Sequence, residues 1–462
     1  MSVPGISDKE GTSMSRTVLF KNFTVVTPNK EGGLSVLSDA FVAVKGDRII
    51  YVGEDRSLGV RALMEAQREC GGTQIGFDEY NGKNKIMLPT FANAHTHIPM
   101  VLMRNSADDM CLEDWLFRRI LPREMHLRKE DVYFASLLGM AEMINGGTGA
   151  AADMYFMSDE TACAALQTGF RMNLCQDGKI NDETGWRADR ASLQSFKNSF
   201  HGAGDGLLRT SLMIHSIYLY PQSLYPDLVA EAADLDVSVQ VHVAETQTEV
   251  ANCIAKYGVT PVAALANFGV FDRPCIAAHG VHLTEADRDI LAAANVTVAH
   301  NPSSNMKLAS GFADVEAMKR QGVRVALGTD GCASNNNMDM YMEMRLASFI
   351  AKGHSRDPEK LSAEEAVIMA TRNGYAGMGF EDCGMIAEGM SADLQIVNYD
   401  IPSMWPLGNP VSALVYSAGT HAVESVMIGG QFVKYKGELK TIDIEKVKAE
   451  TAVRAAYITQ FT

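Results

Sequence analysis

The chain has 462 residues, of which 47% are hydrophobic and 21% are charged, a balance that is ordinary for a globular protein. This length suggests two or three domains, although a single barrel with insertions can account for most of it. The formal net charge of −15 argues against a general nucleic-acid binder, because such proteins carry basic patches.

The cysteines and the N-terminus bear on cellular location. Eight cysteines are scattered along the chain without a C-x-x-C pair, which favours free thiols in a reducing compartment, and we expect a cytoplasmic protein. The N-terminus is polar and lacks the apolar core of a secretory signal, so residues 1–15 are expected to form a flexible tail. No run of about 20 apolar residues occurs, and we expect no transmembrane helix and no membrane partner.

Both ends of the chain have the pattern of β-hairpins. Near the start, a β-rich run over residues 17–28 is followed by "AFVAVKGDRIIYVGE", in which a Gly-Asp turn separates two strands. Near the end, "ADLQIVNYD" precedes "AVESVMIGGQFVKYKGEL", where Gly-Gly forms the turn. We predict that residues 16–85 and 386–440 form one small β-sandwich domain built from both chain ends. A C-terminal helical segment is expected over residues 441–462.

The middle of the chain, residues 86–385, alternates short apolar runs with amphipathic segments. Six such runs are predicted strands: "GTGAAADM", "RTSLMIHSI", "VSVQVHVAE", "CIAAHGVHL", "VTVAHNPSS" and "VRVALGTDG". Strand–helix alternation over this range predicts a parallel α/β fold, and the length favours a (β/α)8 TIM barrel. No G-x-G-x-x-G sequence follows a strand, so no dinucleotide site is expected.

Reactive side chains occur at the C-terminal ends of these strands. They are His95, His97, His215, His242, Glu245, His279, His282, His300 and Asp330. In a parallel barrel these strand ends converge on one face. His95 and His97 lie two residues apart and would face the same interior, where both imidazoles could bind one divalent ion. A single strand-end histidine is usually structural, but a series of them is not explained that way, because burying unpartnered imidazoles costs free energy.

A family resemblance rests on five segments. "NAHTH", "HVAET", "AAHGVHL", "AHNPSSNMKLASG" and "LGTDGCASNNNMDM" together resemble the amidohydrolase superfamily, most closely its deaminases of S-adenosylhomocysteine, 5′-methylthioadenosine and adenosine. The resemblance extends from about Leu88 to Gly374. It implies a distorted (β/α)8 barrel with one divalent metal, most often Zn²⁺ and alternatively Fe²⁺. The implied ligands are His95, His97, His242 and Asp330. No lysine ends the fourth strand, "SLMIHSI", which supports a mononuclear site.

The resemblance also implies the chemistry. His279 would hydrogen-bond the attacking water, and Asp330 would accept its proton. Glu245 would protonate the ring nitrogen beside the carbon under attack, and ammonia would leave to give the inosine analogue. An alternative for Glu245 is a helix N-terminal charge stabilised by the macrodipole.

Substrate-binding residues follow from the same resemblance. Trp115 would lie near the 5′ end of the nucleoside, Glu124 would accept hydrogen bonds from the ribose hydroxyls, and His215 would contact the nucleoside. Alternatively, Trp115 packs inside an amphipathic helix and Glu124 faces solvent. The family has a Pro-Tyr pair soon after this histidine, whereas this chain reads "HSIYLYP".

Four further residues are candidates for the same site. Some family members use arginines, one of them in the loop after the third strand, and Arg187 and Arg190 are the candidates here. Ser303 and Ser334 lie on loops beside the metal face. They would either shape the pocket, where Ser334 is expected to contact the substrate, or form turns.

Two other functions remain open. The same site could act on another aromatic ring, as in guanine, oxidised-purine or pterin deaminases and triazine hydrolases. A non-catalytic scaffold protein on the same fold is disfavoured, because this chain retains all four expected ligands. We therefore predict a small-molecule nucleoside substrate, no nucleic-acid partner and a homo-oligomer.

Overall fold

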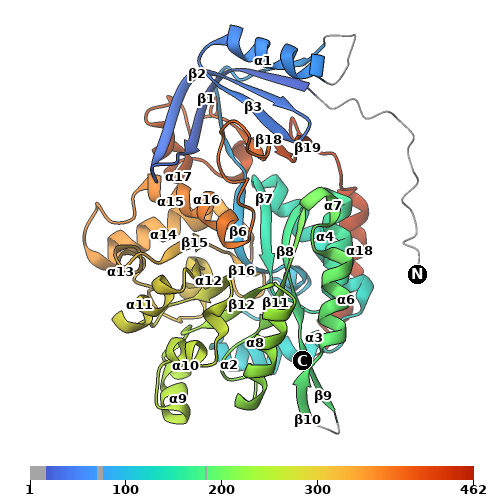
Figure 1. Ribbon diagram of the computed structural model, residues 1–462, viewed down its shortest axis with the longest axis vertical. Coiled ribbons are helices and arrows are strands. Elements are labelled where there is room, and N and C mark those ends of the chain that lie inside the picture. Colours follow the sequence, from blue (N-terminus) through green and yellow to red (C-terminus); the bar gives the residue numbers. More distant parts are fainter. Residues whose placement is uncertain (1–16, 70–75, 183–184, 462) are drawn as a thin grey trace.

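The computed structural model describes residues 17–69, 76–182 and 185–461 (Figure 1). The predicted tail over residues 1–15 lies outside this part of the chain. Within the described residues, no helix is both long and apolar enough to cross a membrane.

Strands from both chain ends form one nine-stranded sheet, here called the end sheet (Figure 1). Its strands are β1 (Thr17–Pro28), β2 (Leu34–Lys45), β3 (Arg48–Gly53), β4 (Asp78–Asn81), β5 (Lys85–Pro89), β17 (Leu394–Asn398), β18 (Val423–Ile428), β19 (Gln431–Tyr435) and β20 (Glu438–Leu439). The order is β20-β19-β18-β17-β5-β1-β2-β3, and β4 pairs with β1. The prediction that both ends build one β structure is therefore confirmed.

The hairpin turns of the end sheet explain why glycine occurs there. Gly429 and Gly430, between β18 and β19, have φ values of 52° and 74°. Both lie in the left-handed region that a two-residue hairpin turn requires and that glycine adopts without strain. A Cβ at Gly430 would lie 1.7 Å from the carbonyl oxygen of Gly46, in the turn between β2 and β3. The N-terminal and C-terminal hairpins therefore meet backbone to backbone.

Eight parallel strand positions form the barrel. They are β6 (Phe91–His97), β7 (Thr148–Asp153), β8 (Arg171–Asp177), β11 (Leu208–Ile214), β12 (Ser238–Val243), β13 (Cys275–His279), β14 (Thr297–His300) and, at the eighth position, β15 (Arg324–Leu327) with β16 (Asp330–Gly331). Asp330 pairs with Thr96, so β16 joins β6 and closes the ring. The predicted barrel is confirmed. The six predicted runs correspond to β7 and to β11–β15, and they include neither β6, which carries His95 and His97, nor β8.

Helices cover the barrel and one face of the end sheet. The longer ones are α1 (Arg56–Glu69), α4 (Lys129–Asn145), α5 (Ser158–Thr168), α6 (Arg190–Phe200), α8 (Tyr225–Asp234), α9 (Gln247–Tyr257), α10 (Pro261–Asn267), α11 (Glu285–Ala293), α14 (Met340–Ser355), α15 (Ala363–Ala370), α17 (Pro410–Tyr416) and α18 (Ile444–Ile458). Shorter elements are η1 (Ile98–Met103), α2 (Leu112–Trp115), η2 (Leu116–Ile120), α3 (Leu121–Glu124), β9 (Lys179–Asp182), β10 (Gly185–Ala188), α7 (Ala203–Gly206), η3 (Gln222–Leu224), η4 (Val270–Asp272), α12 (Pro302–Lys307), α13 (Val315–Arg320), α16 (Arg372–Gly377) and η5 (Thr420–Ala422). The C-terminal helix α18 packs on α4 (Figure 1).

A buried ion pair joins the barrel to the end sheet. Arg171, at the start of β8, approaches Asp393 with its Nε 2.5 Å from Oδ2 and its Nη2 3.1 Å from Oδ1. The backbone N–H of Gly429 also donates to Asp393, at 2.7 Å. Burial alone would raise the pKa of Asp393, but the guanidinium of Arg171 holds it below the ordinary value.

The boundary between the two parts of the chain is short. A single residue, Thr90, separates β5 of the end sheet from β6 of the barrel. We propose the division already expected from the sequence: residues 16–85 with 386–440 as one domain, 86–385 as the barrel, and 441–462 as a C-terminal segment.

Candidate metal and active site

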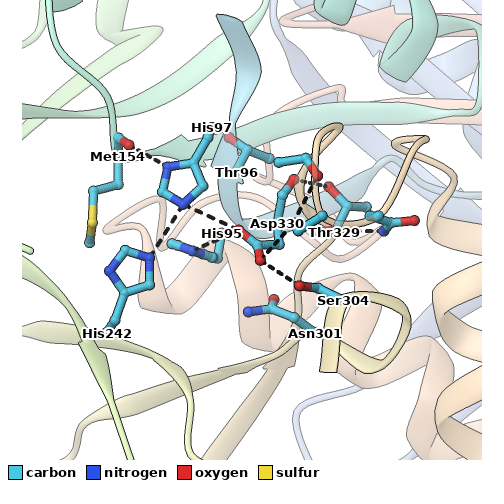
Figure 2. A network of polar contacts seen from close by, with 12 residues as sticks. His95, Thr96, His97, Met154, His242, Asn301, Ser304, Thr329 and Asp330 are labelled. Atoms are coloured by element: carbon cyan, nitrogen blue, oxygen red, sulfur yellow. Dashed lines mark hydrogen bonds and ion pairs between the residues drawn. The ribbon is translucent and has the colours of Figure 1, made fainter. Parts of the chain in front are cut away.

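Four side chains from three strand positions meet at the C-terminal end of the barrel (Figure 2). His95 and His97 come from β6, His242 from β12 and Asp330 from β16. The Oδ1 atom of Asp330 lies 3.5 Å from His95 Nε2 and 3.2 Å from His97 Nε2. His97 Nε2 is also 3.3 Å from His242 Nε2. The structure thus brings together all four residues that the resemblance implies as ligands.

Backbone carbonyls fix the orientation of two of these imidazoles. His97 Nδ1 lies 2.5 Å from the carbonyl oxygen of Met154, and His242 Nδ1 lies 2.7 Å from that of His215 (Figure 2). A carbonyl can only accept a hydrogen bond, so Nδ1 carries the proton in each ring. The Nε2 lone pairs are therefore directed at the centre of the cluster, which is the arrangement that metal-binding histidines need.

His95 supplies a separate test of whether a metal fits. Its side chain is buried, Nδ1 has no hydrogen-bond partner among the described residues, and Nε2 has the 3.5 Å approach to Asp330 Oδ1 but no closer hydrogen bond there. Burial lowers the pKa of His95 to about 4, so the ring is neutral near pH 7. A buried neutral imidazole without a partner is costly, and a divalent cation at the cluster would remove that cost.

The carboxylate of Asp330 is held from its other side. Its Oδ2 accepts hydrogen bonds from Ser304 Oγ at 2.6 Å and Ser334 Oγ at 2.9 Å. Oδ1 is thereby left facing His95 and His97. The backbone of Asp330 has a φ of 62°, an uncommon conformation for aspartate that occurs often at functional sites.

His279 and Glu245 lie beside the cluster. His279 Nδ1 is 2.9 Å from Asn305 Oδ1, and its Nε2 is 3.8 Å from Glu245 Oε2. Glu245 is buried, and its Oε1 accepts a hydrogen bond from Ser310 Oγ at 3.2 Å. Burial raises the pKa of Glu245, although His279 acts in the opposite direction. A raised pKa suits a carboxyl group that must carry a proton to its substrate.

A cavity of about 330 Å³ opens above these residues. It is lined by His97, Met100, Leu112, Trp115, Leu116, Leu121, Glu124, Met154, Tyr155, Phe156, Asp177, Lys179, Trp186, Met213, His215, Tyr218, Leu219, His242, Glu245, Leu308 and Asp330. The walls are mostly apolar, and the polar groups are few, as is usual for small-molecule sites of this size.

Trp115 and Glu124 face this cavity rather than solvent. Glu124 is 8% exposed and accepts a hydrogen bond from the Tyr155 hydroxyl at 2.6 Å, and burial raises its pKa. Trp115 is 5% exposed, and its indole N–H donates to the carbonyl of Ala333 at 3.2 Å. The π-helical turn η2 lies between the two residues. The alternative in which Glu124 faces solvent is therefore wrong.

The wall after β11 differs from the family pattern, as the sequence indicated. His215 lines the cavity, and its ring centroid is 4.6 Å from that of His242. Tyr218 and Leu219 line the same wall. The Tyr220 hydroxyl accepts the backbone N–H of His215 at 3.2 Å, which fixes the end of the strand.

The two serines do not reach the cavity. Ser334 donates to Asp330 instead of lining the pocket, so its position does not support the expected substrate contact. The backbone N–H of Ser303 donates to Glu343 at 3.1 Å. The serine that pairs with the metal-site carboxylate from this segment is Ser304.

The expected arginines are also absent from the residues that line the cavity. Arg190 forms ion pairs with Glu231 and Asp234 on α8, at 2.8 and 2.9 Å. The single lysine or arginine among the described cavity residues is Lys179. Its Nζ lies 2.5 Å from Asp177 Oδ2. Sequence reasoning missed it because β8 and the β9–β10 hairpin after it were not recognised.

The closed parallel barrel and its converging histidines and aspartate are the features of a metal-dependent hydrolase. Residues 86–433 match the amidohydrolase family, and the chain belongs to this family. It is accordingly an enzyme of the hydrolase class, with a site for a divalent metal and a small-molecule substrate.

Proteins that are similar to this chain include named deaminases. A 5-methylthioadenosine/S-adenosylhomocysteine deaminase from Dictyoglomus thermophilum is 44% identical over 375 residues, which are 81% of this chain and 88% of the relative. One from Acetivibrio thermocellus is 40% identical, with 93% and 97% of the two chains covered. The structure of an adenosine deaminase from Xanthomonas campestris with bound zinc is 33% identical, has a TM-score of 0.87, and covers 96% and 98% of the two chains.

Proposed function

We propose that this enzyme hydrolytically deaminates an adenosine-type nucleoside: S-adenosylhomocysteine, 5′-methylthioadenosine or adenosine. The products would be the inosine analogue and ammonia. The observation that carries the proposal is one cavity with the histidine–aspartate cluster and Glu245 at its base and a second buried carboxylate, Glu124, in its wall. Relatives that are 36–44% identical are named 5-methylthioadenosine/S-adenosylhomocysteine deaminases, which supports the same substrate class.

We propose Zn²⁺ as the resident ion, with Fe²⁺ as the alternative. His95, His97, His242 and Asp330 would hold it, since imidazole and carboxylate ligands suit either ion. When bound, the ion supplies the Lewis acidity that makes water a nucleophile near neutral pH.

Side chains of the site would transfer the protons and orient the attacking water. Asp330 takes the proton of the attacking water, and His279 orients that water toward C6 of the adenine ring. Glu245 gives its proton to the adjacent ring nitrogen, so that no negative charge develops on the ring. The C–N bond then breaks, and the amino group leaves as ammonia with the proton that Asp330 returns. The hydroxyl group on C6 gives its proton to Glu245, which forms the carbonyl of the product and restores the acid.

The test is a substrate screen on protein of known metal content. Adenosine, methylthioadenosine, S-adenosylhomocysteine and free bases are supplied separately, and ammonia release is measured with the ultraviolet absorbance of the ring. Ammonia from at least one nucleoside is the expected result. Absence of ammonia from all the nucleosides would refute the proposal.

Glu124→Gln is expected to lower kcat/KM for nucleosides by about 10- to 100-fold, because a hydrogen bond to a charged group contributes roughly 1.5–3 kcal/mol. Steady-state kinetics with adenosine and free adenine measure the effect. Glu113→Gln on α2 is the matched control, since Glu113 is an exposed glutamate of the same helical segment. Unchanged kcat/KM for nucleosides after Glu124→Gln would instead favour an enzyme for another aromatic ring.

Lys179→Met is expected to lower kcat/KM for S-adenosylhomocysteine by about 10-fold and to change the value for methylthioadenosine by less than about 2-fold. The physical reason is charge: an amino-acid tail carries a carboxylate and an ammonium, which could pair with Lys179 and Asp177. The Oδ1 atom of Asp177 is buried and has no hydrogen-bond partner among the described residues. An equal loss with both substrates would show that Lys179 does not contact the tail.

A further inference from the structure

A second buried glutamate, Glu249, binds the backbone that carries Glu245. Glu249 lies in the first turn of α9 and is 7% exposed. Its Oε1 accepts the backbone N–H of Ala244 at 3.0 Å, and its Oε2 accepts that of Glu245 at 2.8 Å. Each carboxylate oxygen therefore accepts a hydrogen bond from one of two consecutive residues in the turn after β12.

This arrangement differs from an ordinary helix cap. In a capping box, the glutamate at the third helical position accepts the N–H of the N-cap residue itself. Ser362 and Glu365 form such a box at the start of α15, with Glu365 Oε2 2.7 Å from the N–H of Ser362. Thr246 is the N-cap of α9, yet Glu249 reaches past it to the two preceding residues. Its carboxylate thus holds the turn that carries Glu245 instead of closing the cap.

The turn needs such support because its backbone is in an uncommon conformation. Ala244 has a φ of 51°, in the left-handed region that alanine rarely adopts. Its carbonyl accepts the N–H groups of Val281 and His282, at 3.0 and 2.9 Å. These two residues follow His279 in the next loop. On the carbonyl side the turn is therefore tied to the loop of His279, and on the N–H side it is tied to Glu249.

A second connection ends on the side chain of Glu245. His282 Nε2 is 2.7 Å from the carbonyl oxygen of Ser310, and Ser310 Oγ donates to Glu245 Oε1 at 3.2 Å. The loops that carry Glu245, His279 and Ser310 thus form one hydrogen-bonded assembly. Loss of the contacts from Glu249 would release the backbone of Glu245 while leaving the metal-site histidines in place.

We propose that Glu249 is a positioning residue, which sets the placement of the Glu245 carboxyl group relative to the substrate ring. The inference rests on the proposed role of Glu245 as the proton donor. It predicts a loss in the chemical step rather than in metal binding or substrate binding, because both carboxylate oxygens of Glu249 are bound to backbone N–H groups. Glu249 does not line the cavity around the metal cluster, and lines instead an adjoining pocket that shares Leu112, Leu116 and Tyr218 with it.

The test compares Glu249→Gln with Glu365→Gln in the full-length chain. The first variant keeps the shape of the side chain but turns an NH₂ group toward a backbone N–H. Its kcat is expected to fall by about 10- to 100-fold, since small misplacements of reacting groups cost about that much, while KM stays within about 3-fold. Metal content is expected to equal that of the wild type. Glu365→Gln makes the same chemical change at an ordinary capping box and is expected to keep the wild-type kcat.

Glu249→Asp is the second variant, and it also serves if Glu249→Gln does not fold. It keeps the charge but is too short to reach both N–H groups, so its kcat should fall with KM unchanged. Wild-type kcat in the folded variants, or a rise in KM without a change in kcat, would overturn the inference. A wild-type enzyme inactive on every nucleoside would refute the proposed function itself, whereas an active wild type with equally active Glu249 variants refutes only the role of Glu249.

Discussion

Glu245→Gln is expected to lower kcat by about 10²- to 10⁴-fold with every substrate that the wild-type enzyme deaminates, which is the usual contribution of general acid catalysis. Glutamine has the size of glutamate but cannot give up a proton. Steady-state kinetics measure the loss. Metal content and the melting temperature are measured on the same preparation, and neither is expected to fall.

The pH dependence gives a second readout for the same variant. Burial raises the pKa of Glu245, so its protonated form persists to higher pH than for an exposed glutamate. A rate that needs this proton is complete below the raised pKa and falls as the pH rises through it. That alkaline decline should be missing from the residual activity of Glu245→Gln. A variant that keeps more than about a tenth of the wild-type kcat would contradict the role of Glu245 as the acid.

His242→Ala is expected to remove the bound metal and nearly all activity. One imidazole of the cluster is lost, and with it the cation that can lower the pKa of water to about 7, so kcat should fall by at least about 10³-fold. Elemental analysis should find well under one ion per chain. The matched control is His421→Ala, which removes an exposed histidine from η5, outside the cluster.

The same measurement separates the enzyme from a non-catalytic relative. Wild-type protein without a stoichiometric ion would favour the scaffold alternative. Full activity after chelation, or a His242→Ala variant that still binds one ion per chain, would refute the proposed ligand set.

The residues of the site were largely predictable, because parallel strands end at one face of a barrel. The pattern of polar residues at strand ends predicted the site residues His95, His97, His242, Glu245, His279 and Asp330. All of these side chains meet at the C-terminal face of the barrel. Strand β8 was not found, because its polar residues hide its apolar alternation. Asn173 in β8 is buried and donates to the carbonyl of Met378, 205 residues further along the chain. No local pattern indicates that such a partner exists.

The parts of the site that escaped prediction depend on contacts rather than on residue types. Lys179 follows a strand that was not recognised, and the family resemblance pointed instead to Arg187 and Arg190 as basic residues. Ser334 was expected to touch the substrate, but its hydroxyl is used by Asp330. Glu249 has the spacing of a helix cap, and only its distances to the backbone of Ala244 and Glu245 distinguish it from one.

The order of strands in the end sheet has a consequence for synthesis on the ribosome. Strand β5 lies between β1 and β17, so one of its edges stays open until residues 394–398 have been made. Strand β5 is followed after one residue by β6. The histidines of β6 likewise lack their neighbour Asp330 until that residue has been made. The nascent chain therefore exposes an unpaired strand edge, a known hazard for association between chains, until its last part emerges. Because Asp330 is the last of its ligands in the sequence, the ion can enter a complete site only after residue 330 of the 462 has been translated.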